Sequence, residues 1–295
     1  MQARHVTFGI KSIPTDYRNV RDAWREADAI PLIESAWLWD HMIPIREPRS
    51  GPMLEGWTLL AALAAQTSRL RLGLMVTGNT NRRPAILAKI AATVDVISGG
   101  RLEFGIGAGG GQHPLAMVEY EMYGVPSFPM SEAIARLDEA CELIRRLWTE
   151  PVVDHDGPHY RARGTFCEPK PIQKPHPPFV IAGSGERMSL RVVARHANTW
   201  NFPVMDPAGE LKTFRHKSQV LDEHCAAIGR DPREIGRQVY LVTSLHDPPA
   251  TREALRSFAA AGATQLIIGL RDPYAPGLMQ RLAEELIAPV AEQLS

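Results

Sequence analysis

Cysteine is scarce in this sequence, and its three cysteines, Cys141, Cys167 and Cys225, lie far apart. None belongs to a CxxC pair, and an odd number of widely spaced cysteines does not build a disulfide framework. The pattern argues against a cysteine-based metal centre and against a disulfide-stabilised secreted domain. We therefore expect no metal site.

Net charge and long apolar runs are also absent. Lysine plus arginine equals aspartate plus glutamate, 33 of each, so no overall field attracts nucleic acid or a membrane surface. No apolar run reaches the roughly 18 residues that a membrane-spanning helix needs. The first ten residues, MQARHVTFGI, lack the apolar segment of a signal peptide. We expect a cytoplasmic protein that acts on a small molecule, with neither nucleic acid nor membrane as a partner.

The composition that is present is that of a globular enzyme. Hydrophobic residues make up 44% of the chain and charged residues 22%. A length of 295 residues suits one large α/β domain, and we expect residues 1–295 to form a single one.

Short apolar runs recur along the whole chain, and each is followed by polar, glycine or turn residues. Eight of them predict strands: Val6–Ile10, Ala36–Trp39, Leu70–Val76, Leu102–Ile106, Phe179–Ala182, Thr199–Phe202, Val239–Ser244 and Gln265–Ile268. Segments with helical spacing alternate with these runs: Tyr17–Ile33, Glu55–Gln66, Pro84–Ser98, Glu132–Trp148, Arg187–His196, Gly209–Ile228, Thr251–Ala261 and Gly277–Leu294. Residues 112–130 show turn residues instead.

One segment interrupts the alternation. Residues 152–169 consist of short alternating pieces around the turn His155–Asp156–Gly157, which predicts a β-hairpin inserted after the fourth helix. The remaining units predict an α/β fold, a (β/α)8 TIM barrel, because alternating strands and helices form parallel sheets. A doubly wound open sheet is the alternative.

In a barrel, the loops that follow the strands form the functional end. Asp40 and His41 follow the second strand. A histidine there can move a proton near neutral pH, or it can simply bond a backbone carbonyl, and the sequence favours neither. Asp40 is expected to orient the loop rather than to act as a base.

Glycine-rich loops follow two further strands. Gly183–Ser184–Gly185 precedes a predicted helix, where free N–H groups suit a phosphate, and Arg187 could add charge. A tight turn that needs glycine for geometry alone is the alternative. Residues 107–111 would let a planar ligand approach the backbone, or serve as a hinge.

Trp37 and Trp39 lie two residues apart on one strand and so face the same side. One of them could line an aromatic pocket. Packing outward onto a helix is the interpretation we favour.

Four blocks of the sequence resemble the bacterial luciferase-like family of flavin- and deazaflavin-dependent oxidoreductases. They are SAWLWDHMIP at 35–44, RLRLGLMVTGNTNRRPAILAKIAATVDVISGGRLEFGIGAG at 69–109, LIRRLWTE at 143–150 with GPHYR at 157–161, and PKPIQKPHPPFVIAGSGERMSLRVVARHANTWN at 169–201. The resemblance implies a (β/α)8 barrel with an insertion, a flavin-type ring in its mouth and often a homodimer. The second block is most similar to members that use the deazaflavin coenzyme F420.

The resemblance also implies roles for single residues. Asp40, His41 and Thr77 would lie near the ring, and Leu74–Met75 would carry a non-prolyl cis peptide under it. The remaining cofactor-binding positions would be Asn79, Gly107, Ala108, Gly109, Gly183, Ser184, Gly185 and Arg187.

The sequence departs from related sugar-phosphate dehydrogenases in one place. They carry a proton-transferring glutamate in the loop after the fourth strand, where this chain has Gly110 or Gly111. Glu119 and Glu121 are near in sequence but do not align with it. The departure argues against a sugar-phosphate substrate.

Three hypotheses follow. The first is an oxidoreductase in which His41 handles the proton while a hydride passes between F420 and an organic substrate. The second is a two-component monooxygenase that uses reduced FMN and oxygen. The third is a non-catalytic protein that binds flavin or deazaflavin and does not need His41.

Overall fold

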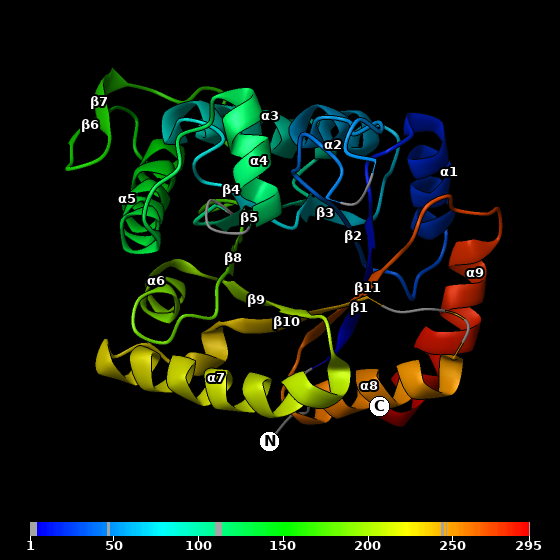
Figure 1. Cartoon of the computed structure of the whole chain (residues 1–295). Coiled ribbons are helices and arrows are strands. Elements are labelled where there is room, and N and C mark those ends of the chain that lie inside the picture. The colour runs from blue at the N-terminus through cyan, green and yellow to red at the C-terminus, as the bar shows by residue number, and fades with distance from the viewer. Residues whose placement is uncertain (1–4, 46–47, 110–113, 243–244, 246, 295) are drawn as a thin grey trace.

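The computed structural model describes residues 5–45, 48–109, 114–242, 245 and 247–294. Its strands form a closed barrel surrounded by helices (Figure 1). The order is β3-β2-β1-β11-β10-β9-β8-β5-β4, and an additional β3–β5 pairing closes the circle. Every barrel pairing is parallel. The predicted (β/α)8 barrel is confirmed, and the open sheet is wrong.

The barrel strands are β1 (Thr7–Ser12), β2 (Ser35–Leu38), β3 (Arg71–Leu74), β4 (Thr77–Gly78), β5 (Leu102–Gly107), β8 (Phe179–Ala182), β9 (Thr199–Val204), β10 (Gly236–Val242) and β11 (Gln265–Gly269). The helices are α1 (Tyr17–Asp28), α2 (Gly56–Ala64), α3 (Pro84–Ser98), α4 (Pro114–Tyr123), α5 (Met130–Thr149), α6 (Ser189–His196), α7 (Pro207–Ala227), α8 (Pro248–Ala260), α9 (Leu278–Leu282) and α10 (Ala288–Leu294). A 3₁₀ turn, η1 (Pro232–Glu234), and a π-helical turn, η2 (Ala283–Ile287), complete the described elements. Among these residues no helix is long and apolar enough to cross a bilayer.

The third barrel strand is broken in two. β3 and β4 share one position in the barrel, and Met75 and Val76 lie between them, joined by a cis peptide bond. The cis bond was predicted one residue earlier, at Leu74–Met75, and that placement is wrong. Gly105 on β5 permits the break, because a Cβ atom there would lie 1.8 Å from the Leu74 carbonyl oxygen.

The inserted hairpin consists of β6 (Val153–Asp156) and β7 (Arg161–Thr165), which pair antiparallel as predicted. Glu139 on α5 fastens it to the barrel. Its carboxylate accepts the backbone N–H groups of His159 and Tyr160, at 3.0 and 2.8 Å. It also contacts the His155 Nε2 at 2.9 Å.

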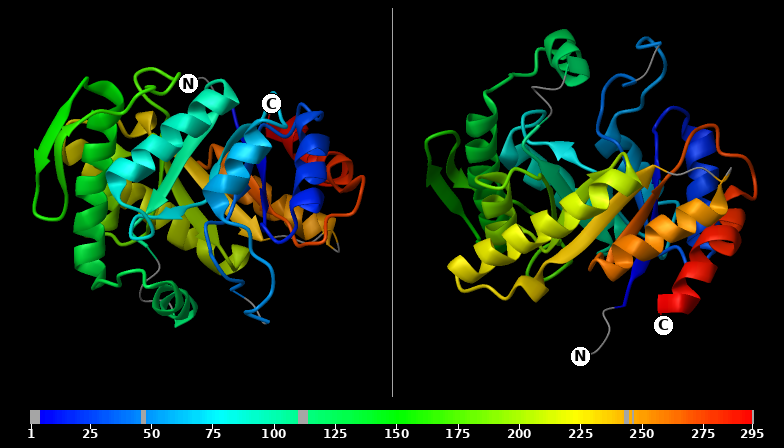
Figure 2. Two further views of the ribbon diagram at one scale, coloured as in Figure 1. Left: turned by 90° about the horizontal axis from the view of Figure 1, so that it is seen from above. Right: turned by 60° about the horizontal axis from the view of Figure 1, so that its bottom comes forward.

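Helix α4 was not predicted, because residues 112–130 show turn residues rather than helical spacing. Its buried residues explain this. Ala116, Glu119 and Tyr120 are buried, while Met117 and Met122 are exposed. A helix that buries a carboxylate and a phenol, and exposes methionines, lacks the apolar stripe by which helices are found in a sequence. In Figure 2, α4 and the segment after β2 project from the same end of the barrel.

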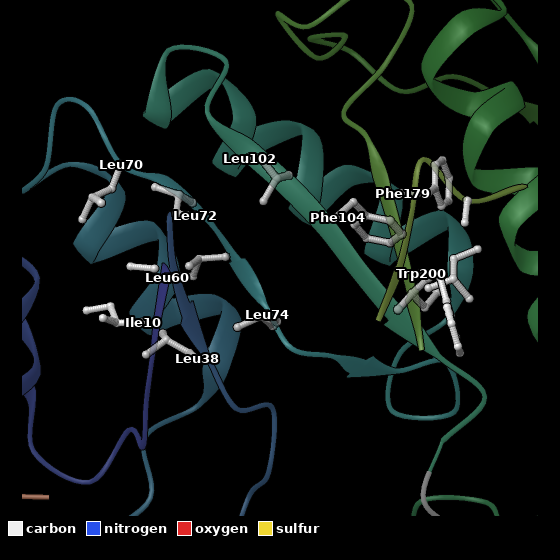
Figure 3. Close-up of a cluster of buried hydrophobic side chains, with 14 of the residues drawn as sticks. Ile10, Leu38, Leu60, Leu70, Leu72, Leu74, Leu102, Phe104, Phe179 and Trp200 are labelled. Carbon is white, nitrogen blue, oxygen red and sulfur yellow. The ribbon is translucent and has the colours of Figure 1, made fainter. Parts of the chain in front are cut away.

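The main core lies between the strands and the helices, and Figure 3 shows part of it around Leu72, Phe104 and Phe179. A second, smaller cluster consists of Trp37, Met75, Val180, Tyr240 and Ile267. Its members come from positions around the barrel, so they fill the interior. The prediction that Trp37 packs outward onto a helix is therefore wrong.

Candidate functional site

A cavity of about 620 Å³ opens where the carboxyl ends of the strands meet, with α4 beside it. Ten of the predicted site residues line it: Asp40, His41, Met75, Thr77, Gly107, Ala108, Gly109, Gly183, Ser184 and Gly185. Trp39 lines it too, so of the two tryptophans it is the one that faces a pocket. This volume lies within the range of roughly 300–1,000 Å³ typical of small-molecule sites.

The structure places three predicted residues elsewhere. The Leu74 side chain belongs to the main core. Asn79 lines a separate cavity of about 350 Å³ beside the first. Arg187 is exposed and lies in the turn before α6, which begins at Ser189 rather than at Arg187 as predicted. The arginine therefore does not sit inside the first helical turn.

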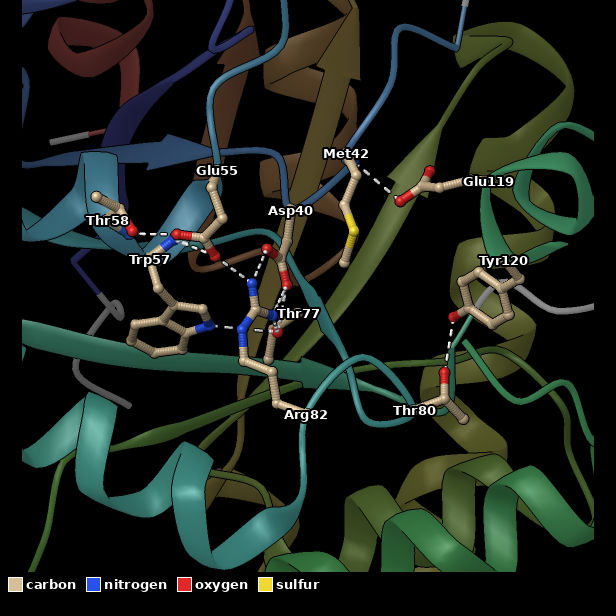
Figure 4. A network of polar contacts seen from close by, with 10 residues as sticks. All are labelled: Asp40, Met42, Glu55, Trp57, Thr58, Thr77, Thr80, Arg82, Glu119 and Tyr120. Carbon is tan, nitrogen blue, oxygen red and sulfur yellow. Dashed lines mark hydrogen bonds and ion pairs between the residues drawn. The ribbon is translucent and has the colours of Figure 1, made fainter. Parts of the chain in front are cut away.

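Asp40 is held in one orientation by Arg82 (Figure 4). The guanidinium donates two hydrogen bonds to the carboxylate, at 2.6 and 2.9 Å, and the Thr77 hydroxyl donates another. Burial raises the pKa of Asp40, and the hydrogen bond and charge of Arg82 oppose this rise. Arg82 also contacts Glu55, which caps α2 by accepting the backbone N–H of Thr58. These contacts tie Asp40 to the loop after β4, and its expected role in orienting its own loop stays a prediction.

His41 is paired with Glu119 of α4. The His41 Nδ1 lies 2.8 Å from one carboxylate oxygen of Glu119, and the other oxygen accepts the Met42 backbone N–H at 3.0 Å. The Glu119 side chain is 2% exposed and that of His41 34%. With Nδ1 engaged, Nε2 is the imidazole nitrogen left to meet a ligand. This carboxylate is the main site feature that the sequence did not predict.

Two further contacts shape the cavity. Tyr120 of α4 accepts a hydrogen bond from the Thr80 hydroxyl at 2.8 Å, which fixes α4 to the loop after β4. Lys11, at the end of β1, also lines the cavity and was not predicted to do so. No metal site was expected, and within the described ranges no cluster of three His, Cys, Asp or Glu residues could hold a metal ion.

The cavity suits a cofactor with a planar ring. Met75 and Val76 line one wall, and Gly107 to Gly109 present backbone on another. A side chain at either glycine would crowd its neighbours, since a Cβ at Gly107 would lie 3.0 Å from the Val76 Cγ2 and one at Gly109 2.6 Å from the Thr80 Oγ1. The lining is mostly apolar, with a few polar groups that converge, as in cofactor sites generally.

A model of the luciferase-like monooxygenase family matches residues 4–289. The chain belongs to this family. It is 32% identical over 261 residues to an F420-dependent glucose-6-phosphate dehydrogenase of Intrasporangium calvum, covering 86% of this chain and 73% of that protein. It is 31% identical over 222 residues to a phthiodiolone/phenolphthiodiolone dimycocerosates ketoreductase of Mycobacterium sp. (strain JLS), covering 74% of this chain and about half, 51%, of that relative.

A solved structure supports the same fold for this luciferase-like protein. An F420-dependent secondary alcohol dehydrogenase in complex with an F420–acetone adduct superposes with a TM-score of 0.80 at 16% identity, covering 97% of this chain and 99% of that one. The protein is thus an oxidoreductase of the luciferase-like family, whose members use F420 or FMN.

Proposed function

We propose that this protein is an F420-dependent oxidoreductase that exchanges a hydride between the deazaflavin and a small organic substrate. The observation that carries the proposal is the His41–Glu119 pair, which leaves the imidazole Nε2 free beside a cavity of cofactor size. The choice of F420 rests on the relatives at 31–32% identity, one of which is named as F420-dependent.

The cofactor would lie with its ring against Met75 and Val76. The Gly107–Gly109 backbone would border the ring, and the Gly183–Gly185 loop before α6 would take its phosphate. When bound, F420 supplies or accepts a hydride at C5 of the deazaflavin ring. The protein supplies orientation and proton handling.

His41 would hold the proton that accompanies the hydride. In the reducing direction the His41 Nε2 would give the substrate one proton, and bound F420 would supply the hydride with its two electrons. In the other direction the same nitrogen accepts the proton. Glu119 keeps the Nδ1 proton of His41 in place, which leaves Nε2 to exchange protons with the substrate.

The substrate is proposed to be something other than a sugar phosphate. Gly110 and Gly111, where sugar-phosphate dehydrogenases carry a glutamate, lie outside the described residues, and neither has a carboxylate to offer. In this chain the carboxylate beside His41 comes from α4 instead. Because this carboxylate comes from a different position in the chain, we expect the substrate-binding end of the cavity to differ in shape from that of sugar-phosphate dehydrogenases.

A cofactor titration tests the proposal. We expect purified protein to quench F420 fluorescence and shift its absorption band with a Kd in the micromolar range, and to bind FMN at least about tenfold more weakly. Tighter binding of FMN would favour the monooxygenase alternative. Failure of both cofactors to bind at tens of micromolar would contradict the proposal.

A further inference from the structure

Lys11 is a buried lysine whose ammonium lacks an anionic partner. It lies at the end of β1, lines the cavity and is 6% exposed. No carboxylate in the described ranges pairs with it, and no described group hydrogen-bonds with its Nζ atom. The Nζ lies 4.0 Å from the centre of the Tyr240 ring and 4.9 Å from that of Trp39. Two aromatic faces have therefore replaced water around this group.

A glycine on the neighbouring strand makes room for this arrangement. Lys11 on β1 is in register with Gly269 on β11. A Cβ atom at Gly269 would lie 2.7 Å from the Tyr240 Cε2, so the missing side chain makes room for the ring. Tyr240 also belongs to the interior cluster that contains Met75. The lysine thus lines the cavity beside the interior cluster that contains Met75, against which the cofactor ring is proposed to lie.

The other ionisable groups that line the cavity are already paired. Asp40 is neutralised by Arg82, and Glu119 is bonded to His41 and to the Met42 N–H. Among the described residues, Lys11 is the cavity's one basic side chain that no carboxylate compensates. Burial lowers the pKa of Lys11 well below its usual value. An anion beside it would favour the charged form again.

The proposed reaction generates such an anion. A hydride adds one negative charge to the ring that it joins, spread over the ring's carbonyl oxygens and nitrogens, until a proton follows. Positive charge near that part of the ring is one way in which proteins tune such cofactors. We propose that the Lys11 ammonium binds the negatively charged edge of the reduced cofactor ring, so that the site binds reduced cofactor more tightly than oxidised. This inference rests on the proposed function.

Binding of the two redox forms tests the inference without turnover. The Kd of oxidised and of reduced F420 is measured anaerobically at pH 7 for the wild type, Lys11→Met and Lys11→Gln. We expect the neutral variants to lose at least about tenfold in affinity for reduced F420 and less than about threefold for oxidised F420. Lys212→Met, which removes an exposed charge on α7, is the matched control and should bind both forms like the wild type. Circular dichroism and thermal unfolding establish that each variant is folded, and the glutamine variant serves if the methionine variant is not.

The outcomes separate the two proposals. An unchanged ratio of the two Kd values in a folded Lys11 variant would overturn the role of Lys11 and leave the proposed function standing. An equal loss of affinity for both redox forms would also overturn it, because the lysine would then recognise a part of the cofactor that does not change charge. If the wild type binds FMN rather than F420, the proposed function is overturned and this inference falls with it. If it binds neither, both proposals fall.

Discussion

Ionisable side chains around the cavity are hydrogen-bonded in pairs, Asp40 with Arg82 and His41 with Glu119. We predict a catalytic role for one of these pairs, His41 and Glu119. Replacing His41 with Asn should lower kcat by about 10²–10⁴-fold, because general acid–base catalysis is worth that much, and leave the Kd of the cofactor nearly unchanged. Steady-state kinetics with a substrate in hand, together with the titration, would measure both quantities.

We propose that Glu119 acts on the reaction through His41, and a double-mutant cycle distinguishes this role from a purely structural one. Glu119→Gln should lower kcat in the wild type and have almost no further effect in His41→Asn, since residues that act as a unit are not additive. Glu121→Gln is the control, because Glu121 lies on the same helix and is exposed. Additive losses from the two changes would contradict the coupling.

Because Lys11 is buried, we expect the free energy of unfolding to depend on pH at neutral to alkaline pH. Burial lowers the pKa of Lys11 in the folded protein, whereas the pKa of a lysine in the unfolded chain is about 10.4. Between those two values the unfolded chain binds one more proton than the folded chain, so the free energy of unfolding rises with pH, by up to about 1.4 kcal/mol per pH unit. At pH values below the folded-state pKa of Lys11, both states bind the proton. The contribution of Lys11 to the free energy of unfolding is then constant and unfavourable to the folded state.

Lys11→Met abolishes this contribution, and we expect the variant to be more stable than the wild type at neutral pH by about 1 kcal/mol or more. Its advantage should shrink as the pH approaches 10. Urea denaturation of both proteins across this pH range gives the difference, and Lys212→Met should keep the wild-type slope. A difference between wild type and Lys11→Met that stays flat with pH would show that Lys11 is not desolvated.

At the scale of elements, Asp40 joins the end of β2 to the loop that follows β4. Asp40→Asn keeps the shape of the side chain but leaves the Arg82 guanidinium, whose side chain is 13% exposed, without its buried counter-charge. Breaking a buried pair in this way costs about 3–5 kcal/mol. Chemical denaturation should show a loss of that order. Glu55→Gln, which removes a partner of Arg82 that is 43% exposed, should cost about 1 kcal/mol or less.

The strands and the longer helices could be predicted because their signal is apolar. Runs such as Leu102–Ile106 and the stripe on α5 bury hydrophobic side chains, and burial of that kind leaves a pattern in the sequence. α4 left none, because its buried face carries Glu119 and Tyr120. β1 was predicted to end at Ile10, and Lys11 and Ser12 were missed for the same reason: both are polar and yet buried.

The same contrast holds within the site. Asp40, His41 and the glycine loops could be predicted because they follow strands, and the ends of parallel strands meet at one rim. Glu119 could not, because its approach to His41 depends on how α4 lies over the cavity. Trp37 was assigned to the wrong side of its strand, since alternation tells which residues share a face but not which face is inward.

At the scale of the whole molecule, the cavity belongs to no single segment. Its lining includes Lys11 from β1, the loops after β2, β4, β5 and β8, and one helix outside the barrel's strand–helix alternation. Barrel closure through the β1–β11 and β3–β5 pairings is what brings these parts to one end. The assembly of the cavity therefore depends on pairing between strands that are distant in sequence, as well as on the residues that line it.

The pairing of Lys11 with Gly269 has a consequence for synthesis of the chain. The first strand of the protein can complete its surroundings only after the last strand has been made, because β11 lies between β1 and β10 and carries the glycine that seats Tyr240. Contacts between such distant residues form late and slowly. A chain released before β11 would hold β1 with an unpaired edge, prone to pair with other chains, and its barrel would stay open.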